Sequence, residues 1–169
     1  MRTKKNICSF SALILMFIFN SCSTSKSLPS GEVNYLSSND GALTMRAIGI
    51  GNNEGEAITD ATYNAFDVLL FRGLPESEQK NALVGTNENE ERGKHKDYFE
   101  GLYKGRYKSF VMSSIPSSDL IKYKGGKKGI AVDVKINTVA LRKDLEQNDI
   151  IRKFGFVTTQ VDSFNLVNR

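Results

Sequence analysis

The side chains that could carry out acid–base chemistry are few, and their spacing does not form a catalytic set. The single histidine, His95, lies in a polar, lysine-rich stretch, and a general base or a metal site needs partner residues. We therefore interpret it as a solvent-exposed loop histidine. Asp60 and Asp67 are seven residues apart on a predicted helix, and outward solvation is favoured over a carboxylate pair. We expect no enzyme activity, no cofactor and no metal site.

A glycine-rich segment from Gly49 to Gly55 could surround a phosphate, because it connects a predicted strand to a predicted helix. The glycine spacing differs from the dinucleotide-binding fingerprint, and no second parallel βαβ unit is predicted. Glu54 and Glu56 would also repel an anion at that helix end. A plain strand-to-helix turn is the favoured interpretation.

Cys22 has the clearest chemical role. The chain begins Met-Arg-Thr-Lys-Lys and continues with an apolar run from Phe10 to Phe19, which is the order of a secretory signal peptide. That run is about half as long as a membrane-spanning helix requires, so a cleaved leader of residues 1–21 is favoured over a permanent span. Ser21 directly before Cys22 resembles the lipobox of bacterial lipoproteins, which implies a lipid on the Cys22 sulfur.

The net charge gives no argument for a nucleic-acid partner. The chain has 23 basic and 19 acidic residues, and removing the leader takes away Arg2, Lys4 and Lys5. The remaining balance of 20 basic to 19 acidic residues is close to neutral. Cys8 leaves with the leader and Cys22 carries lipid, so no disulfide is expected.

The first half of the chain predicts a tether, a strand and a long helix. Residues 22–40 are rich in Ser, Thr and Asn and are interpreted as a flexible tether. Residues 41–160 would form a single domain, beginning with a strand over 42–50. Asn53 and Glu56 approximate a capping box for a helix through Arg72, with a stripe of small residues at Ala57, Ala61 and Ala65. A short second helix would run through Leu83.

The second half predicts a variable insertion, three strands and a final helix. Residues 85–105 are interpreted as the insertion, ending in a short amphipathic helix. Alternating residues predict a strand over 107–115 and a clearer strand over 130–137, whose partner lies near 119–123. Thr138 would cap the final helix. This order predicts an α+β, two-layer fold with helices on an antiparallel, or mixed, sheet.

A family resemblance rests on the leader with its lipobox and on four internal segments. These are Ala47-Ile48-Gly49-Ile50-Gly51, the helix containing Glu56-Ala57-Ile58 and Asp60-Ala61, the strand Val132-Asp133-Val134-Lys135-Ile136, and Leu141-Arg142-Lys143-Asp144-Leu145. Together they resemble a small envelope-lipoprotein domain. It is similar to membrane-associated lipoproteins of epsilon-proteobacteria and to flagellar-assembly accessory proteins, over residues 43–72 and 107–155. The resemblance implies an accessory or assembly role without catalysis.

Two surface features are candidates for binding. Tyr98, Phe99, Tyr103 and Tyr107 cluster around the end of the insertion, either as a clamp that holds it onto the sheet or as an exposed anchor for a partner. The lysine-rich turn from Lys122 to Lys128 could touch anionic lipid headgroups, although a solvated hairpin tip is favoured.

The expected function is that of a lipid-anchored envelope lipoprotein acting as a non-catalytic binding or assembly module. Cys22 would hold it on the outer membrane, facing the periplasm, with an envelope protein as its partner. The alternative is an accessory protein that binds an envelope or cell-wall glycan. An aromatic and polar cleft would favour the glycan, and a flat aromatic patch would favour the protein.

Overall fold

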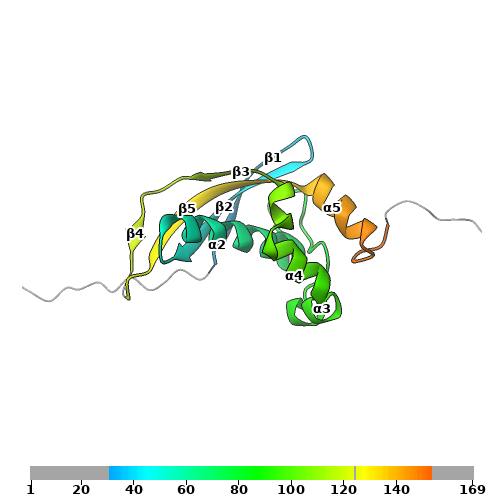
Figure 1. Ribbon diagram of the computed structural model, residues 1–169. Helices are drawn as coiled ribbons and strands as arrows, with labels where there is room; N and C mark the ends of the chain where they lie inside the picture. The colour runs from blue at the N-terminus through cyan, green and yellow to red at the C-terminus, as the bar shows by residue number, and fades with distance from the viewer. Residues whose placement is uncertain (1–30, 124, 154–169) are drawn as a thin grey trace, which may run out of the picture.

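A five-stranded antiparallel sheet forms one layer of the domain. The computed structural model describes residues 31–123 and 125–153, so the leader and Cys22 lie outside the described residues. The strands are β1 (Val33–Asn39), β2 (Ala42–Gly51), β3 (Val111–Pro116), β4 (Ile121–Lys122) and β5 (Lys128–Asn137). Their order is β1-β2-β5-β3, and β4 also pairs with β5 (Figure 1).

The helices lie on one side of this sheet and leave its other face open (Figure 1). They are α2 (Glu54–Asp67), the π-helix η1 (Val68–Arg72), α3 (Glu88–Lys94), α4 (Lys96–Lys104), the 3-10 helix η2 (Arg106–Ser109) and α5 (Thr138–Gln147). The α+β, two-layer class predicted from the sequence is confirmed, and the described strand pairs are all antiparallel.

Helix α2 packs on the sheet at very short range. Ala57, Ala61 and Ala65 are fully buried, as the predicted small-residue stripe requires. A Cβ on Gly49 of β2 would stand 2.0 Å from the carbonyl oxygen of Ala57, and one on Gly51 would stand 2.5 Å from the Ala57 nitrogen. These two glycines are therefore explained by packing, because no side chain fits between β2 and the helix backbone.

The predicted capping box at the start of α2 is present in a modified form. Asn53 Oδ1 accepts from the Glu56 nitrogen at 2.9 Å, which satisfies one free donor of the first turn. The Glu56 carboxylate in turn accepts hydrogen bonds from the Asn52 nitrogen at 2.9 Å and from the Asn53 side-chain amide at 2.8 Å. The turn from Asn52 to Glu56 is thus closed by its own side chains.

The N-terminal boundary of the domain differs from the prediction. Residues 33–39, assigned to the tether of residues 22–40, form strand β1 and pair with β2. Asp40 and Gly41 make the two-residue turn between these strands, and both have positive φ, 51° and 73°. An Asp-Gly pair with positive φ at both positions is the turn that best fits the twist of a hairpin.

The stretch between η1 and α3 does not form the predicted second helix. Gly73 has a φ of 77°, which ends the helix, and the chain then turns back along η1. The nitrogens of Leu83 and Val84 donate to the carbonyls of Leu69 and Leu70, both at 3.0 Å. Both carbonyls lie in the last turn of η1, where the helix provides no donor for them, so they are free to hold the returning loop.

The segment 85–105, interpreted from the sequence as a variable insertion, ends in the predicted short amphipathic helix and takes part in the core through it. It forms α3 and α4, and α4 contributes Phe99 and Leu102, which are 3% and 0% exposed, to the hydrophobic core. Strand β3 starts at Val111, because Tyr107 belongs to η2. Asn137, not Thr138, is the N-cap of α5, and it accepts from the Ala140 nitrogen at 2.9 Å.

Candidate functional site

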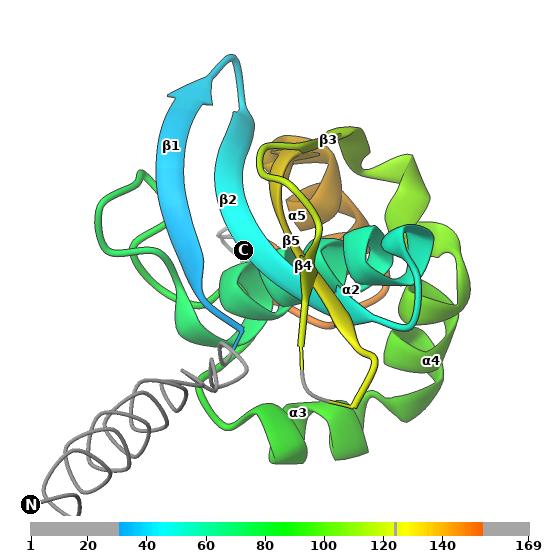
Figure 2. The same ribbon diagram turned by 90° about the vertical axis from the view of Figure 1, so that its left-hand side faces the viewer.

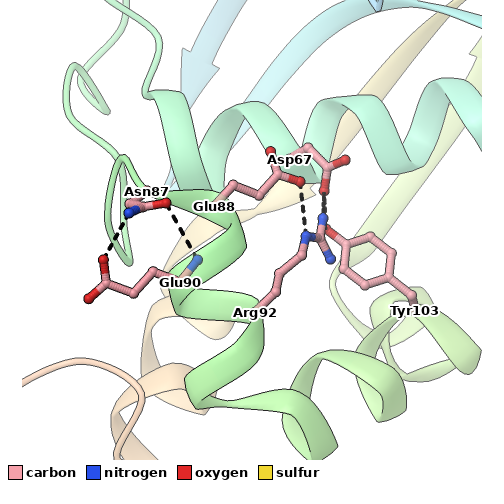
Figure 3. A network of polar contacts seen from close by, with 6 residues as sticks. All are labelled: Asp67, Asn87, Glu88, Glu90, Arg92 and Tyr103. Atoms are coloured by element: carbon pink, nitrogen blue, oxygen red, sulfur yellow. Dashed lines mark hydrogen bonds and ion pairs between the residues drawn. The ribbon is translucent and has the colours of Figure 1, made fainter.

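A partly buried ionic network joins the end of α2 to α3 and α4. Nη2 of Arg92 donates to Asp67 Oδ1 at 2.6 Å, and the Tyr103 hydroxyl donates to the same oxygen. Arg92 Nε also donates to Glu88 at 2.9 Å (Figure 3). Arg92 of α3 thus connects three helices, because its partners Asp67 and Tyr103 belong to α2 and α4.

The same guanidinium lies against three aromatic rings. It stands 4.8 Å from the ring centre of Phe71, 5.7 Å from that of Phe99 and 4.7 Å from that of Tyr103. A cation partly removed from water is stabilised by the negative faces of such rings. Arg92 therefore acts as both the ionic and the packing centre of this corner of the domain.

The start of α3 fixes where Arg92 points. Asn87 caps the helix by accepting from the Glu90 nitrogen at 3.4 Å, and its side-chain amide donates to Glu90 Oε2 at 2.8 Å. With the helix start fixed there, Glu88 and Arg92 are four residues apart on one face and form an ion pair. Both contacts are local, so the sequence itself determines them.

The network keeps its tyrosine in the neutral form. Burial raises the pKa of Tyr103 above its ordinary value, and the nearby Asp67 carboxylate raises it further. Burial also raises the pKa of Asp67, while the hydroxyl of Tyr103 and the charge of Arg92 act in the opposite direction. Tyr103 is therefore a hydrogen-bond donor, and the charges of Asp67 and Arg92 offset each other.

A cavity of about 340 Å³ opens beside this network. Its lining combines two aromatic side chains, Phe99 and Tyr103, with Arg92, Lys96 and Glu100. Cavities that mix apolar walls with a few polar groups are the usual form of small-ligand sites. Phe99 and Tyr103 are two of the aromatic residues singled out in the sequence.

The four aromatic candidates have three different surroundings: the cavity, Asp144 of α5, and Tyr63 of α2. Phe99 and Tyr103 line the cavity, whereas the Tyr98 hydroxyl donates to Asp144 of α5 at 2.8 Å. Tyr107 is 8% exposed. All four rings pack on the domain itself, as the clamp interpretation requires; binding of a partner by any of them stays a prediction.

Tyr63 of α2 connects two of these aromatic residues to the helix. Its ring meets those of Tyr103 and Tyr107 edge to face, with centres 5.1 Å and 5.0 Å apart. Its hydroxyl donates to the Tyr103 carbonyl at 2.7 Å. Sequence reasoning did not single out Tyr63 or Arg92, because their partners are far away in the chain and no local pattern reports such pairs.

The remaining sequence candidates are used within the fold. His95 is not an exposed loop residue: its side chain is 17% exposed at the junction of α3 and α4, and its Nε2 lies 3.9 Å from Glu91. Asp60 accepts from the Ile50 nitrogen at 2.8 Å, while Asp67 binds Arg92. The predicted outward solvation of these two aspartates is therefore wrong, and they serve different partners.

Within residues 31–123 and 125–153, no group of three or more His, Cys, Asp or Glu side chains is placed to hold a metal ion. No helix of these same segments has the length and apolarity needed to cross a membrane. Comparisons with protein-family models, with curated proteins and with solved structures found no match to this chain.

Proposed function

We propose that the chain is a lipid-anchored envelope lipoprotein whose domain acts as a non-catalytic binding or assembly module. The leader and Cys22 support export and a lipid anchor, for which we propose the outer membrane, with the domain facing the periplasm. In this proposal the Arg92 network has a structural role, because its charged groups are engaged with one another. The structural feature that carries the binding role is the open face of the sheet.

This open face combines charge with exposed apolar side chains. At its centre Arg46 and Asp133 form a two-point ion pair, with distances of 2.7 Å and 2.9 Å. Ile115 lies directly opposite Asp133 on β3 and is 61% exposed, and Met112 at the bulge of the same strand is 56% exposed. Exposed apolar residues surrounded by polar groups mark protein-interaction surfaces.

The strand order supports the same role. Among the described strands, β1 pairs only with β2 and β3 pairs only with β5, so each has an edge available to another chain. An extended segment of a partner can add to such an edge through backbone hydrogen bonds. We place the partner, an envelope protein, on the open face next to β3.

Affinity capture from envelope extracts tests this placement. In the full-length chain, Met112→Ser with Ile115→Ser should reduce the captured protein partner without a change in melting temperature, because both side chains are already exposed. Val139→Ser is the matched control, since Val139 is 63% exposed on α5. Capture of the same partner at the same yield by the double variant would overturn the placement.

The anchor has a separate test. Cys22→Ala removes the sulfur that would accept the lipid, so the variant should not incorporate a labelled fatty acid and should no longer sediment with membranes. Cys8→Ala is the control, because Cys8 lies within the predicted leader. A Cys22→Ala protein that still labels and still sediments would contradict the lipoprotein assignment.

Binding of an envelope glycan is the second candidate, and the cavity beside Arg92 favours it. Phe99 and Tyr103 supply aromatic surface, and Glu100 and Lys96 supply polar groups at the rim. Lys96→Ala with Glu100→Ala should weaken binding of soluble cell-wall glycan fragments without lowering stability, whereas Lys104→Ala should not. Unchanged binding of the fragments by the first variant would remove this candidate.

A further inference from the structure

The end of the sheet where the chain enters the domain also carries the lysine-rich hairpin. Glu32 accepts from the Ile48 nitrogen at 3.1 Å, and Gly51, three residues further along β2, pairs with Lys128. Three residues of strand and two strand spacings place residue 32 within about 15 Å of that lysine. In Figure 2 the start of β1 and the β4–β5 hairpin lie at the same end, opposite the β1–β2 turn.

Among the described residues, Lys122, Lys127 and Lys128 of this hairpin form no ion pair. Lys122 and Lys128 stand directly opposite each other on β4 and β5, and like charges in that position destabilise a strand pair. Hydrogen bonds from Asn52 and Asn53 hold the Glu56 carboxylate and lower the pKa of Glu56, and the charge of Lys127 contributes to this lowering.

Apolar groups accompany these charges. Ile121 is 37% exposed. The ring of Tyr123 crosses β5 at Gly129, where a Cβ would stand 2.4 Å from Tyr123 Cε2. Because side chains alternate along a strand, Ile121 and Tyr123 lie on the open face of the sheet, and Lys122 and Lys128 lie on the other side of the hairpin. The hairpin end therefore presents apolar groups on one side and positive charge on the other. Tyrosine, lysine and a branched apolar side chain together are the composition found where proteins meet the headgroup layer of a membrane.

We propose that Ile121, Lys122, Tyr123, Lys127 and Lys128, the hairpin surface, dock on anionic phospholipid headgroups of the membrane that holds the lipid anchor. The inference rests on the proposed lipid anchor at Cys22. Nine residues lie between Cys22 and Glu32, and the ten steps from one to the other span at most about 35 Å, so the anchor keeps this end of the sheet near the bilayer. Headgroup phosphates then offset the Lys122–Lys128 repulsion.

This docking orients the whole domain. Strand β2 runs ten residues from the Asp40–Gly41 turn to the hairpin end. Its length places that turn about 30 Å from the lipid surface. The open face and the β3 edge then stand at the side of the domain, accessible to an envelope protein.

The test uses the chain from Cys22 onward, coupled through its single thiol to maleimide lipid in vesicles, so that natural processing is not involved. Vesicles contain phosphatidylcholine alone or with phosphatidylglycerol. Phosphatidylglycerol should slow hydroxyl-radical oxidation of Tyr123 and acetylation of Lys127. A decrease of about fivefold is expected, which corresponds to about 1 kcal/mol in total, the contribution of one basic residue at an anionic surface. Acetylation of Lys143, on α5, should not change.

Matched variants separate the hairpin surface from overall charge. Lys122→Gln, Lys127→Gln and Lys128→Gln together should abolish the protection of Tyr123. Lys80→Gln, Lys104→Gln and Lys143→Gln remove the same charge from exposed positions elsewhere and should leave the protection intact. Equal oxidation of Tyr123 on both vesicle types, or equal loss of protection in both variants, would overturn the proposal.

Two further outcomes identify alternatives. Equal protection by soluble polyglutamate, with untethered protein, would show that the hairpin surface binds acidic polypeptides and would overturn the lipid assignment. Failure of Cys22 to take up fatty acid in cells would contradict the anchor alone, because the coupled vesicles still report whether the hairpin surface contacts anionic lipid.

Discussion

The backbone nitrogen of Ala61 stands 2.2 Å from the position that a Cβ on Gly49 would occupy. Since the obstacle is backbone, no side chain can rotate away, and Gly49→Ala must push α2 off the sheet. We expect a loss of about 3 kcal/mol in the free energy of unfolding, at the upper end for overpacking. Thermal and urea melts measure it.

Gly55→Ala is the control for that substitution. Gly55 lies in the first turn of α2, and the nearest atom to its Cβ would be Asn53 Oδ1 at an ordinary 3.5 Å. Alanine is the better helix former, so this variant should be neutral or stabilised by up to about 1 kcal/mol. Equal melting of both alanine variants would show that β2 and α2 are not in close contact.

The second prediction concerns strand β5, along which buried residues alternate with residues of the open face. Val134 is fully buried, whereas Lys135 stands between Thr44 and Ser113 on the open face. Val134→Asp buries an unpaired carboxylate and should cost about 3 kcal/mol or more. The free energy of unfolding of Lys135→Asp should lie within about 0.5 kcal/mol of that of the wild type. Equal losses of unfolding free energy for the two variants in denaturant titrations would mean that the buried and exposed sides of β5 are wrongly assigned.

The elements predicted from the sequence are those with a strong local pattern. The alternation from Ile130 to Asn137 and the alanine spacing of α2 each reflect one buried face, so pattern alone located them. Strand β1 was missed because it lies at the sheet edge, where its alternation of Val33 and Tyr35 with polar residues resembles a tether. The Asp40–Gly41 pair was the available signal for that hairpin.

The candidate site was less predictable, for a physical reason. The Asp67–Arg92 contact joins residues 25 positions apart, and its strength comes from partial burial among rings of other helices. No periodicity records such a contact. The aromatic cluster was visible in the sequence, but its split between the cavity, α5 and α2 depends on the bend at His95 that separates α3 from α4.

The third prediction concerns pH. Hydrogen bonds from Arg46 hold the pKa of Asp133 below its ordinary value of 3.8. A carboxyl group with a lowered folded-state pKa stabilises the fold above its unfolded pKa, and this contribution is lost as pH falls through the lowered value. The wild type should therefore lose stability below about pH 4 more steeply than Asp133→Asn. The effect is small because the pair is solvent-exposed.

Salt provides the control for that pH effect, because an exposed ion pair is screened. The difference in slope between wild type and Asp133→Asn, measured by melts from pH 6 down to pH 2.5, should shrink at high ionic strength. Parallel slopes at low salt would show that the Arg46–Asp133 pair contributes nothing to acid stability.

The last prediction decides whether the aromatic residues of α4 are a clamp. The Tyr98 hydroxyl donates to Asp144, and the Tyr98 ring lies beneath Arg106, whose guanidinium is 4.4 Å from the ring centre. Tyr103 holds Asp67 and packs on Tyr63. Tyr98→Ala with Tyr103→Ala removes both rings and should lower the free energy of unfolding by about 3 kcal/mol or more.

The matched variant Tyr98→Phe with Tyr103→Phe retains both rings and removes only the hydroxyls. Each lost hydrogen bond to a carboxylate should cost about 1.5 kcal/mol, so this variant should melt at a temperature between the wild type and the alanine variant. Capture from envelope extracts should be unchanged for the phenylalanine variant. An alanine variant that melts like the wild type but loses its captured partner would instead identify these tyrosines as an exposed anchor.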